Sequence, residues 1–223
     1  MGERGSKKGP GGLAAGGVRV LEIPVPAETD QLSKLLESKL GSKVAARRAV
    51  LAAAEEFGLP DDAQRRVHTA LALTRLGADL DVIAKGLAWD EFEEYCASAV
   101  SAAGYAVLRN VRMRKPARQI DIIAESASLV LSIDCKHWRR SAGHGSLGAP
   151  ALAQAERTRM YAQRRRPADP RAFLPVLLTM VDNQVRVVSG VPVVPLVALR
   201  EFLASVSPFD EGFSFVRGQP TSG

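Results

Sequence analysis

The sequence contains little histidine, cysteine or aromatic residue, with three His, two Cys and 5% Phe, Trp and Tyr among 223 residues. Cys96 and Cys135 do not have the spacing of metal ligands, and they indicate buried thiols in a reducing, cytoplasmic compartment. No apolar run reaches the roughly 20 residues of a membrane-spanning helix. The basic N-terminus has no apolar segment behind it, so it does not resemble a signal peptide. We therefore expect a cytoplasmic protein with no membrane partner, and a core of small aliphatic side chains.

Basic residues outnumber acidic ones. The chain has 30 Lys and Arg against 24 Asp and Glu, which gives a formal charge of +6 and a pI of about 9.6. This excess favours a polyanionic partner such as nucleic acid.

Shifts in composition divide the chain into four parts. Residues 1–27 are expected to form a flexible basic tail and a short extended segment. Residues 28–87 have helical periodicity, and residues 88–206 alternate between helix and strand patterns. Residues 207–223 are expected to be a loosely ordered C-terminal tail.

The helical region at 28–87 is expected to form a small bundle, with helices that end at Gly41 and Gly77. On its second helix, the residues Val44, Ala45, Val50 and Leu51 are expected to share one apolar face. Such a bundle can bind nucleic acid as a helix-turn-helix, or it can have a structural or dimerising role. The sequence favours neither alternative.

A helix is predicted from Asp90 to Gly104, with an apolar stripe that includes Phe92. Glu93 lies at the edge of this stripe, so it is the acid best placed to lean toward the surface on which the helix packs. Glu94 points further out. Glu93 is also placed to complete a capping box with Asp90 at the N-cap, and both roles are compatible.

The stretch Gln119–Trp138 (QIDIIAESASLVLSIDCKHW) predicts a β-hairpin. Because side chains alternate along a strand, Asp134 and Lys136 share one face, opposite to Cys135. A pairing of Ala124 with Leu129 would place Asp121 opposite Ser132 and diagonal to Asp134. A shift of one residue would move Asp121 to the other face.

Two carboxylates without histidine favour a hard cation, Mg²⁺ or Mn²⁺, over zinc. Asp121 and Asp134 would hold the ion, and the backbone carbonyl of Cys135 would add a ligand. Lys136 would orient or deprotonate the attacking water and stabilise the transition state. Glu93 would bind the same ion, a second ion or a metal-bound water.

Glu93 in FEEYCASAV, Asp121 in QIDIIA, and Asp134 with Lys136 in SIDCKHW together resemble the PD-(D/E)xK nuclease superfamily. Within it, the pattern is similar to Mrr-like type IV restriction endonucleases and archaeal Holliday junction resolvases, over about residues 88–204. The resemblance implies a restriction-endonuclease-like α/β fold and identifies these four residues as catalytic. It also implies that Gln154 faces the site.

The elements after the hairpin fit that fold. A helix is expected over about 150–165, then a buried strand in FLPVLLTMVD, two shorter strands, and a closing helix near Pro195. The order α-β-β-β-α-β-β-α predicts a mixed central sheet flanked by helices, preceded by the small helical domain.

Cationic residues lie on both sides of the hairpin and on the helix after it, and they are expected to bind the phosphate backbone. With the glutamine, the expected nucleic-acid-binding residues are Arg109, Arg112, Arg114, Lys115, Arg118, Arg139, Arg140, Gln154 and Arg157.

The sequence thus predicts a Mg²⁺-dependent DNA endonuclease that acts on branched, damaged or modified DNA, in restriction or in repair and recombination. Because one site cuts one strand and a duplex has two, a homodimer is compatible with this activity. The alternative is a nucleic-acid-binding protein that keeps the fold without cleaving.

Overall fold

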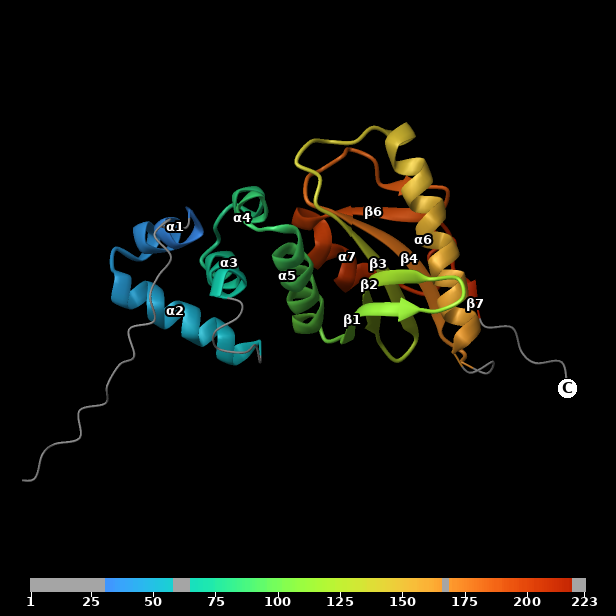
Figure 1. The fold of residues 1–223 in the computed structure, drawn as a ribbon, viewed down its shortest axis with the longest axis horizontal. Coiled ribbons are helices and arrows are strands. Elements are labelled where there is room, and N and C mark those ends of the chain that lie inside the picture. The colour runs from blue at the N-terminus through green and yellow to red at the C-terminus, as the bar shows by residue number, and fades with distance from the viewer. Residues whose placement is uncertain (1–30, 58–64, 166–168, 218–223) are drawn as a thin grey trace, which may run out of the picture.

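The computed structural model of the chain describes residues 31–57, 65–165 and 169–217. Four helices lie on one side of α5, and a mixed sheet with its covering helices lies on the other (Figure 1). The predicted tail at 1–27 lies outside the described residues. In the part of the chain that the structure describes, no helix is both long and apolar enough to cross a membrane.

The first four helices are α1 (Gln31–Leu40), α2 (Lys43–Glu56), α3 (Arg65–Arg75) and α4 (Leu80–Gly86). Gly41 and Gly77 end α1 and α3 with φ of 65° and 66°, a left-handed conformation that a side chain disfavours.

The expected buried face of α2 is wrong. The helix buries Ala46, Ala53 and Ala54, whereas Val44 and Leu51 are 63% and 49% exposed. Small side chains on the inner face let the helix approach α1 and α3 closely.

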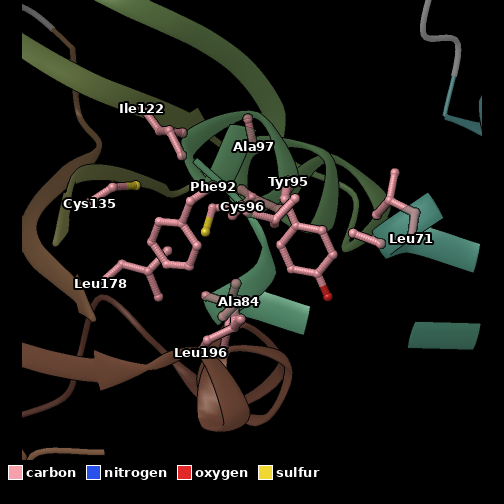
Figure 2. Packing of buried hydrophobic residues seen from close by; sticks show 14 of the residues in the cluster. Leu71, Ala84, Phe92, Tyr95, Cys96, Ala97, Ile122, Cys135, Leu178 and Leu196 are labelled. Carbon is pink, nitrogen blue, oxygen red and sulfur yellow. The ribbon is translucent and has the colours of Figure 1, made fainter. Parts of the chain in front are cut away.

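Helix α5 (Trp89–Ala102) is the central element of the molecule. It buries Leu71 and Ala84 of the preceding helices on one side, and it packs on Ile122, Cys135 and Leu178 of the sheet on the other (Figure 2). One apolar cluster therefore runs from α1 through α5 into the sheet, which is why α5 is buried well beyond the single predicted stripe.

The start of α5 also differs from the expectation. The N-cap is Ala88, and its backbone N–H donates to Glu91 Oε2 at 2.7 Å. Glu91, not Glu93, therefore closes the capping box with its side chain, and Glu93 is left free of that role.

The sheet has seven strands in the order β1-β2-β3-β4-β6-β5, with β7 paired to β4. The first three strands are antiparallel, while β4 is parallel to both β3 and β6. The mixed sheet flanked by helices confirms the predicted α/β class. The strands are β1 (Ala106–Met113), β2 (Arg118–Glu125), β3 (Leu129–Lys136), β4 (Ala172–Thr179), β5 (Val187–Val188), β6 (Val191–Pro195) and β7 (Val216–Arg217).

Helix α6 (His144–Arg164) covers one face of the sheet, and α5 with α7 (Leu199–Ser205) covers the other, where a short 3-10 helix (Leu196–Ala198) leads into α7 (Figure 1). Both faces of the sheet are covered, so β3 and β4 are almost continuously buried, and β4 is almost continuously apolar.

Two boundaries differ from the prediction. Helix α6 begins at His144 rather than near Pro150, because the buried Leu147 anchors an extra turn and Pro150 is tolerated inside the helix. The segment expected to be a loose tail carries β7 and packs Phe213 and Phe215 on the core.

Candidate active site

The β2–β3 hairpin brings two acids together. The strands pair Ile122 with Ile133 and Ala124 with Leu131. Continuing that register by one residue sets Asp121 across from Asp134. The expected pairing of Ala124 with Leu129 is wrong by two residues, because the turn is centred one residue further along the chain than assumed. An even shift preserves the face, so both carboxylates still point to the same side, closer together than the predicted diagonal.

Asp121 is held against β3 by a backbone contact. Its Oδ2 accepts a hydrogen bond from the Cys135 N–H at 2.8 Å. Burial raises the pKa of Asp121, and the negative charge of Asp134 adds to this, although the Cys135 N–H, Lys136 and Arg157 counteract it. The Asp121 carboxylate is therefore held in a fixed position, and the nearby positive groups offset its negative charge only in part.

Glu93 reaches the same region from α5. It is 9% exposed, and its pKa is raised from 4.5 to about 7, first by burial and then by Asp121. Arg109 lowers this pKa, while Asp134 raises it further. Three acids from a helix and two strands thus share one region of negative potential, which we call the acid site: Glu93, Asp121 and Asp134.

Asp134 faces two cations. Lys136 Nζ lies 2.6 Å from its Oδ2, and Arg157 donates from Nη2 to its Oδ1 at 2.8 Å. The lysine contact lacks hydrogen-bond geometry, and Oδ2 has no hydrogen-bond partner among the described residues. Each oxygen of the Asp134 carboxylate therefore already faces a cation.

A buried amide holds Arg157 in place. Gln154 is fully buried, donates from Nε2 to the backbone oxygen and Oγ of Ser132 at 2.7 and 2.9 Å, and accepts from Arg157 Nε at 2.7 Å. Gln154 thus supports Arg157 from within the core, whereas the resemblance implied that it faces the site. Its burial contradicts a direct contact with nucleic acid.

The sequence did not reveal the role of Glu94. This residue was expected to point outward, but it is 5% exposed and forms an ion pair with Arg109 of β1. The pair links α5 to the sheet beside Glu93. Arg109 was predicted to bind nucleic acid, and it is already engaged by a protein carboxylate.

Behind the acid site, the two cysteines meet as free buried thiols, as predicted. A hydrogen bond with Cys96, together with burial, raises the pKa of Cys135 well above its ordinary value. They pack between α5 and β3, with Phe92 beside them (Figure 2).

The other predicted cations are at the surface. Arg112, Arg114, Lys115 and Arg118 lie exposed on and around the β1–β2 turn. Arg139 and Arg140 are exposed after β3, where they line a shallow hollow with His137, Trp138, Ser141, Ala142 and Ser146.

The acid site suits a hard divalent cation by its donor chemistry. All three side chains offer oxygen, and burial first, then neighbouring acids, raises the pKa values of Glu93 and Asp121. Among the described residues, Asp134 Oδ2 accepts no hydrogen bond. In the side-chain arrangement that the described residues adopt, no three His, Cys, Asp or Glu side chains form a ready-made metal cluster. The residues therefore fit Mg²⁺ or Mn²⁺ chemically, and the side chains must rearrange to hold the ion.

Comparison with known families agrees with this geometry. Residues 84–166 match the family model described as "Restriction endonuclease". This part of the chain is thus similar to restriction endonucleases, which is consistent with the restriction-endonuclease-like superfamily. The match contains the whole acid site with Lys136, Gln154 and Arg157, and the mixed sheet is the restriction-endonuclease-like fold.

An uncharacterised protein of Archaeoglobus fulgidus is 28% identical over 130 residues, which are 57% of this chain and 98% of that relative. No solved structure matches the chain. The relative therefore adds nothing on the substrate.

Proposed function

We propose that the protein is a metal-dependent DNA endonuclease that hydrolyses phosphodiester bonds. The observation that carries this proposal is the acid site, where Asp121 and Asp134 face each other one residue beyond a paired stretch of β2 and β3. Lys136 lies beside Asp134, and the negative charges of Asp121 and Asp134 both raise the pKa of Glu93. A protein that only binds DNA gains nothing from three acids beside the surface that binds phosphate, because their charges repel the DNA backbone.

In this proposal, Asp121 and Asp134 hold a Mg²⁺ or Mn²⁺ ion, with Glu93 and the backbone carbonyl of Cys135 as further oxygen ligands. The bound ion would polarise the scissile phosphate and its attacking water. The Cys135 N–H fixes the Asp121 carboxylate, so that this ligand is preorganised.

In this proposal, the Lys136 ammonium group provides a positive charge next to the reacting phosphate. Its side chain is 24% exposed and ends 2.6 Å from Asp134 Oδ2. An ammonium in this position can orient the attacking water and offset the charge that grows on the phosphorus oxygens.

The exposed cations around the β1–β2 turn and after β3 are proposed to hold the DNA backbone on either side of the site. Trp138, in the hollow with Arg139 and Arg140, is suited to stack on an unpaired base. Branched, damaged and modified DNA are the substrates to compare, as expected for a role in restriction or in repair. Branched and damaged DNA expose unpaired bases on which Trp138 could stack.

The test is cleavage of supercoiled plasmid, branched and single-stranded DNA, with and without Mg²⁺, by the wild type and Asp134→Ala. We expect Mg²⁺-dependent nicking that Asp134→Ala abolishes. The matched control is Asp169→Asn, which also removes a carboxylate paired with an arginine but leaves the acid site intact. Equal nicking by the wild type and Asp134→Ala would refute the proposal.

A second candidate is a DNA-binding protein that does not cleave. The observation in its favour is that Arg157 already neutralises part of Asp134, while no ready metal cluster is formed by the described residues. DNA binding that persists with no nicking in Mg²⁺ or Mn²⁺ would select this candidate.

A further inference from the structure

Arg157 is the feature of the acid site that metal-dependent hydrolysis does not require. It is an arginine bonded to a carboxylate oxygen that a metal ion would need. Its side chain is 18% exposed, so it is partly withdrawn from the surface where DNA would lie. From these contacts we infer that Arg157 is a resident counter-ion that competes with the divalent metal for Asp134. The inference rests on the proposed function.

The contacts of Arg157 are those of a fixed group. Its Nε donates to Gln154 Oε1 at 2.7 Å, while Nη2 donates to Asp134 Oδ1 at 2.8 Å. Gln154 is in turn anchored on Ser132, two residues before Asp134 on the same strand. The guanidinium is thus held on both sides and needs no other ligand to keep it at the carboxylate.

Charge explains why the site would contain such a group. Without a cation, three largely buried carboxylates from α5, β2 and β3 would repel one another. Arg157 and Lys136 offset this repulsion at Asp134. They leave Asp121 and Glu93 uncompensated by a direct ion pair among the contacts described.

The same arrangement works against a metal ion. An ion bound through Asp134 must draw on lone pairs that the guanidinium now uses, and it must approach a fixed positive charge. Metal binding therefore requires the Arg157–Asp134 hydrogen bond to break or lengthen. The affinity of the site for the ion is set below the value that the three acids alone would give.

Arg159 provides a matched control on the same helix. It lies two residues further along α6, about 200° around the helix axis, and pairs with the exposed Glu156. Its side chain is 54% exposed. Replacing either arginine removes one positive charge from α6, but only Arg157 touches the acid site.

The experiment is titration of the purified full chain with Mn²⁺ alone, without DNA, by calorimetry and by the electron paramagnetic resonance signal of free Mn²⁺. We expect Arg157→Gln to bind Mn²⁺ about five- to twentyfold more tightly than the wild type, the scale of one charge-assisted hydrogen bond. Arg157→Lys, which keeps the charge, should stay within about threefold of the wild type, and Arg159→Gln within about twofold.

Three results would overturn the inference: equal affinity of Arg157→Gln and the wild type, weaker binding by Arg157→Gln, or an equal gain in Arg159→Gln. Weaker binding would make Arg157 a positioning residue for Asp134, and an equal gain would reduce the effect to net charge. Absence of Mn²⁺ binding to the wild type and every variant would instead refute the metal site of the proposed function.

A measurement on the wild type alone covers the case in which Arg157→Gln does not fold. In crystals soaked with Mn²⁺, we expect the ion at Asp134 and the Arg157 Nη2 to Asp134 Oδ1 separation beyond hydrogen-bonding distance. An ion bound by Asp134 with that hydrogen bond intact would overturn the inference.

Discussion

Two groups of charged residues share strand β2 and differ in how their charges are balanced. The acid site is at Asp121 on β2, and a second group, the arginine cluster, lies at Glu125, four residues along the strand and about 13 Å away by strand geometry. The arginine cluster consists of Glu125, Asp169, Arg165 and Arg171.

In the arginine cluster every carboxylate is matched. Glu125 accepts from Arg165 and Arg171, and Arg171 also binds Asp169 through two nitrogens. The hydrogen bonds from Arg171 lower the pKa of Asp169. At the acid site, by contrast, the pKa values of Glu93 and Asp121 are raised. One group stabilises the connection of β2, α6 and β4, and the other retains unbalanced charge, as a cation-binding site requires.

The largest effect is expected from Lys136→Ala at the acid site. Loss of its ammonium should lower the rate of DNA cleavage by about 10²- to 10⁴-fold, because the charge on the transition state is no longer offset. DNA affinity should change little. The measurement is single-turnover nicking beside a binding assay, with Lys85→Ala on α4 as the control. Unchanged nicking by Lys136→Ala would remove the lysine from the mechanism.

Arg171→Met tests the arginine cluster. Removing the guanidinium breaks the ion pair of Asp169 and leaves Glu125 with Arg165 and Tyr161. Unfolding in urea should therefore show a loss of stability of about 1 to 3 kcal/mol. Cleavage per folded molecule should be unchanged. Arg186→Met, whose partner Asp182 is on the surface, should lose less than about 1 kcal/mol. Equal losses of stability in Arg171→Met and Arg186→Met would show that the arginine cluster stabilises the fold no more than a surface ion pair does.

Glu93→Gln tests the excess of negative charge. A carboxyl whose folded pKa is raised to about 7 binds its proton more tightly in the folded state, so wild-type stability falls as pH rises from about 4.5 through 7. The neutral variant avoids this loss. We expect Glu93→Gln to be more stable than the wild type at pH 8 by about 1 to 2 kcal/mol, with little difference at pH 4.

The measurement is urea unfolding of both proteins at the two pH values without divalent ions. Reduced stability of Glu93→Gln at pH 8 would show that Glu93 makes a favourable contact as a charged group. Glu93 would then be stabilised as a charged group, as Glu125 is in the arginine cluster.

The smallest effects are expected from exposed cations. The double change Arg112→Ser with Arg114→Ser should weaken DNA binding severalfold and reduce the slope of log affinity against log salt by about 1 to 2. The parallel change of Arg47 and Arg48 on α2, both exposed, decides between the two roles left open for the helices. An equal loss of slope would indicate that the N-terminal helices also bind DNA.

Local pattern accounts for much of the fold. The alternation along LVLSIDCK predicts β3 and places Asp134 and Lys136 on one face, and Gly41 and Gly77 end helices where expected. The start of α6 was missed because glycines and Pro150 usually break helices, whereas here the burial of Leu147 outweighs their propensity. The buried face of α2 was missed because packing against two helices favoured alanine over larger side chains.

The sequence by itself determined the order of the elements, the spacing of Asp134 and Lys136, and the face of the hairpin on which Asp121 lies. Each depends only on chain periodicity, and a register change of two residues leaves the face unchanged. Only the tertiary structure decided that Glu91 rather than Glu93 closes the capping box, that Glu94 pairs with Arg109, and that Gln154 holds Arg157 against Asp134. The contacts with Arg109 and Asp134 join residues distant in the chain, and they depend on how α5 and α6 cross the sheet, which no local pattern specifies.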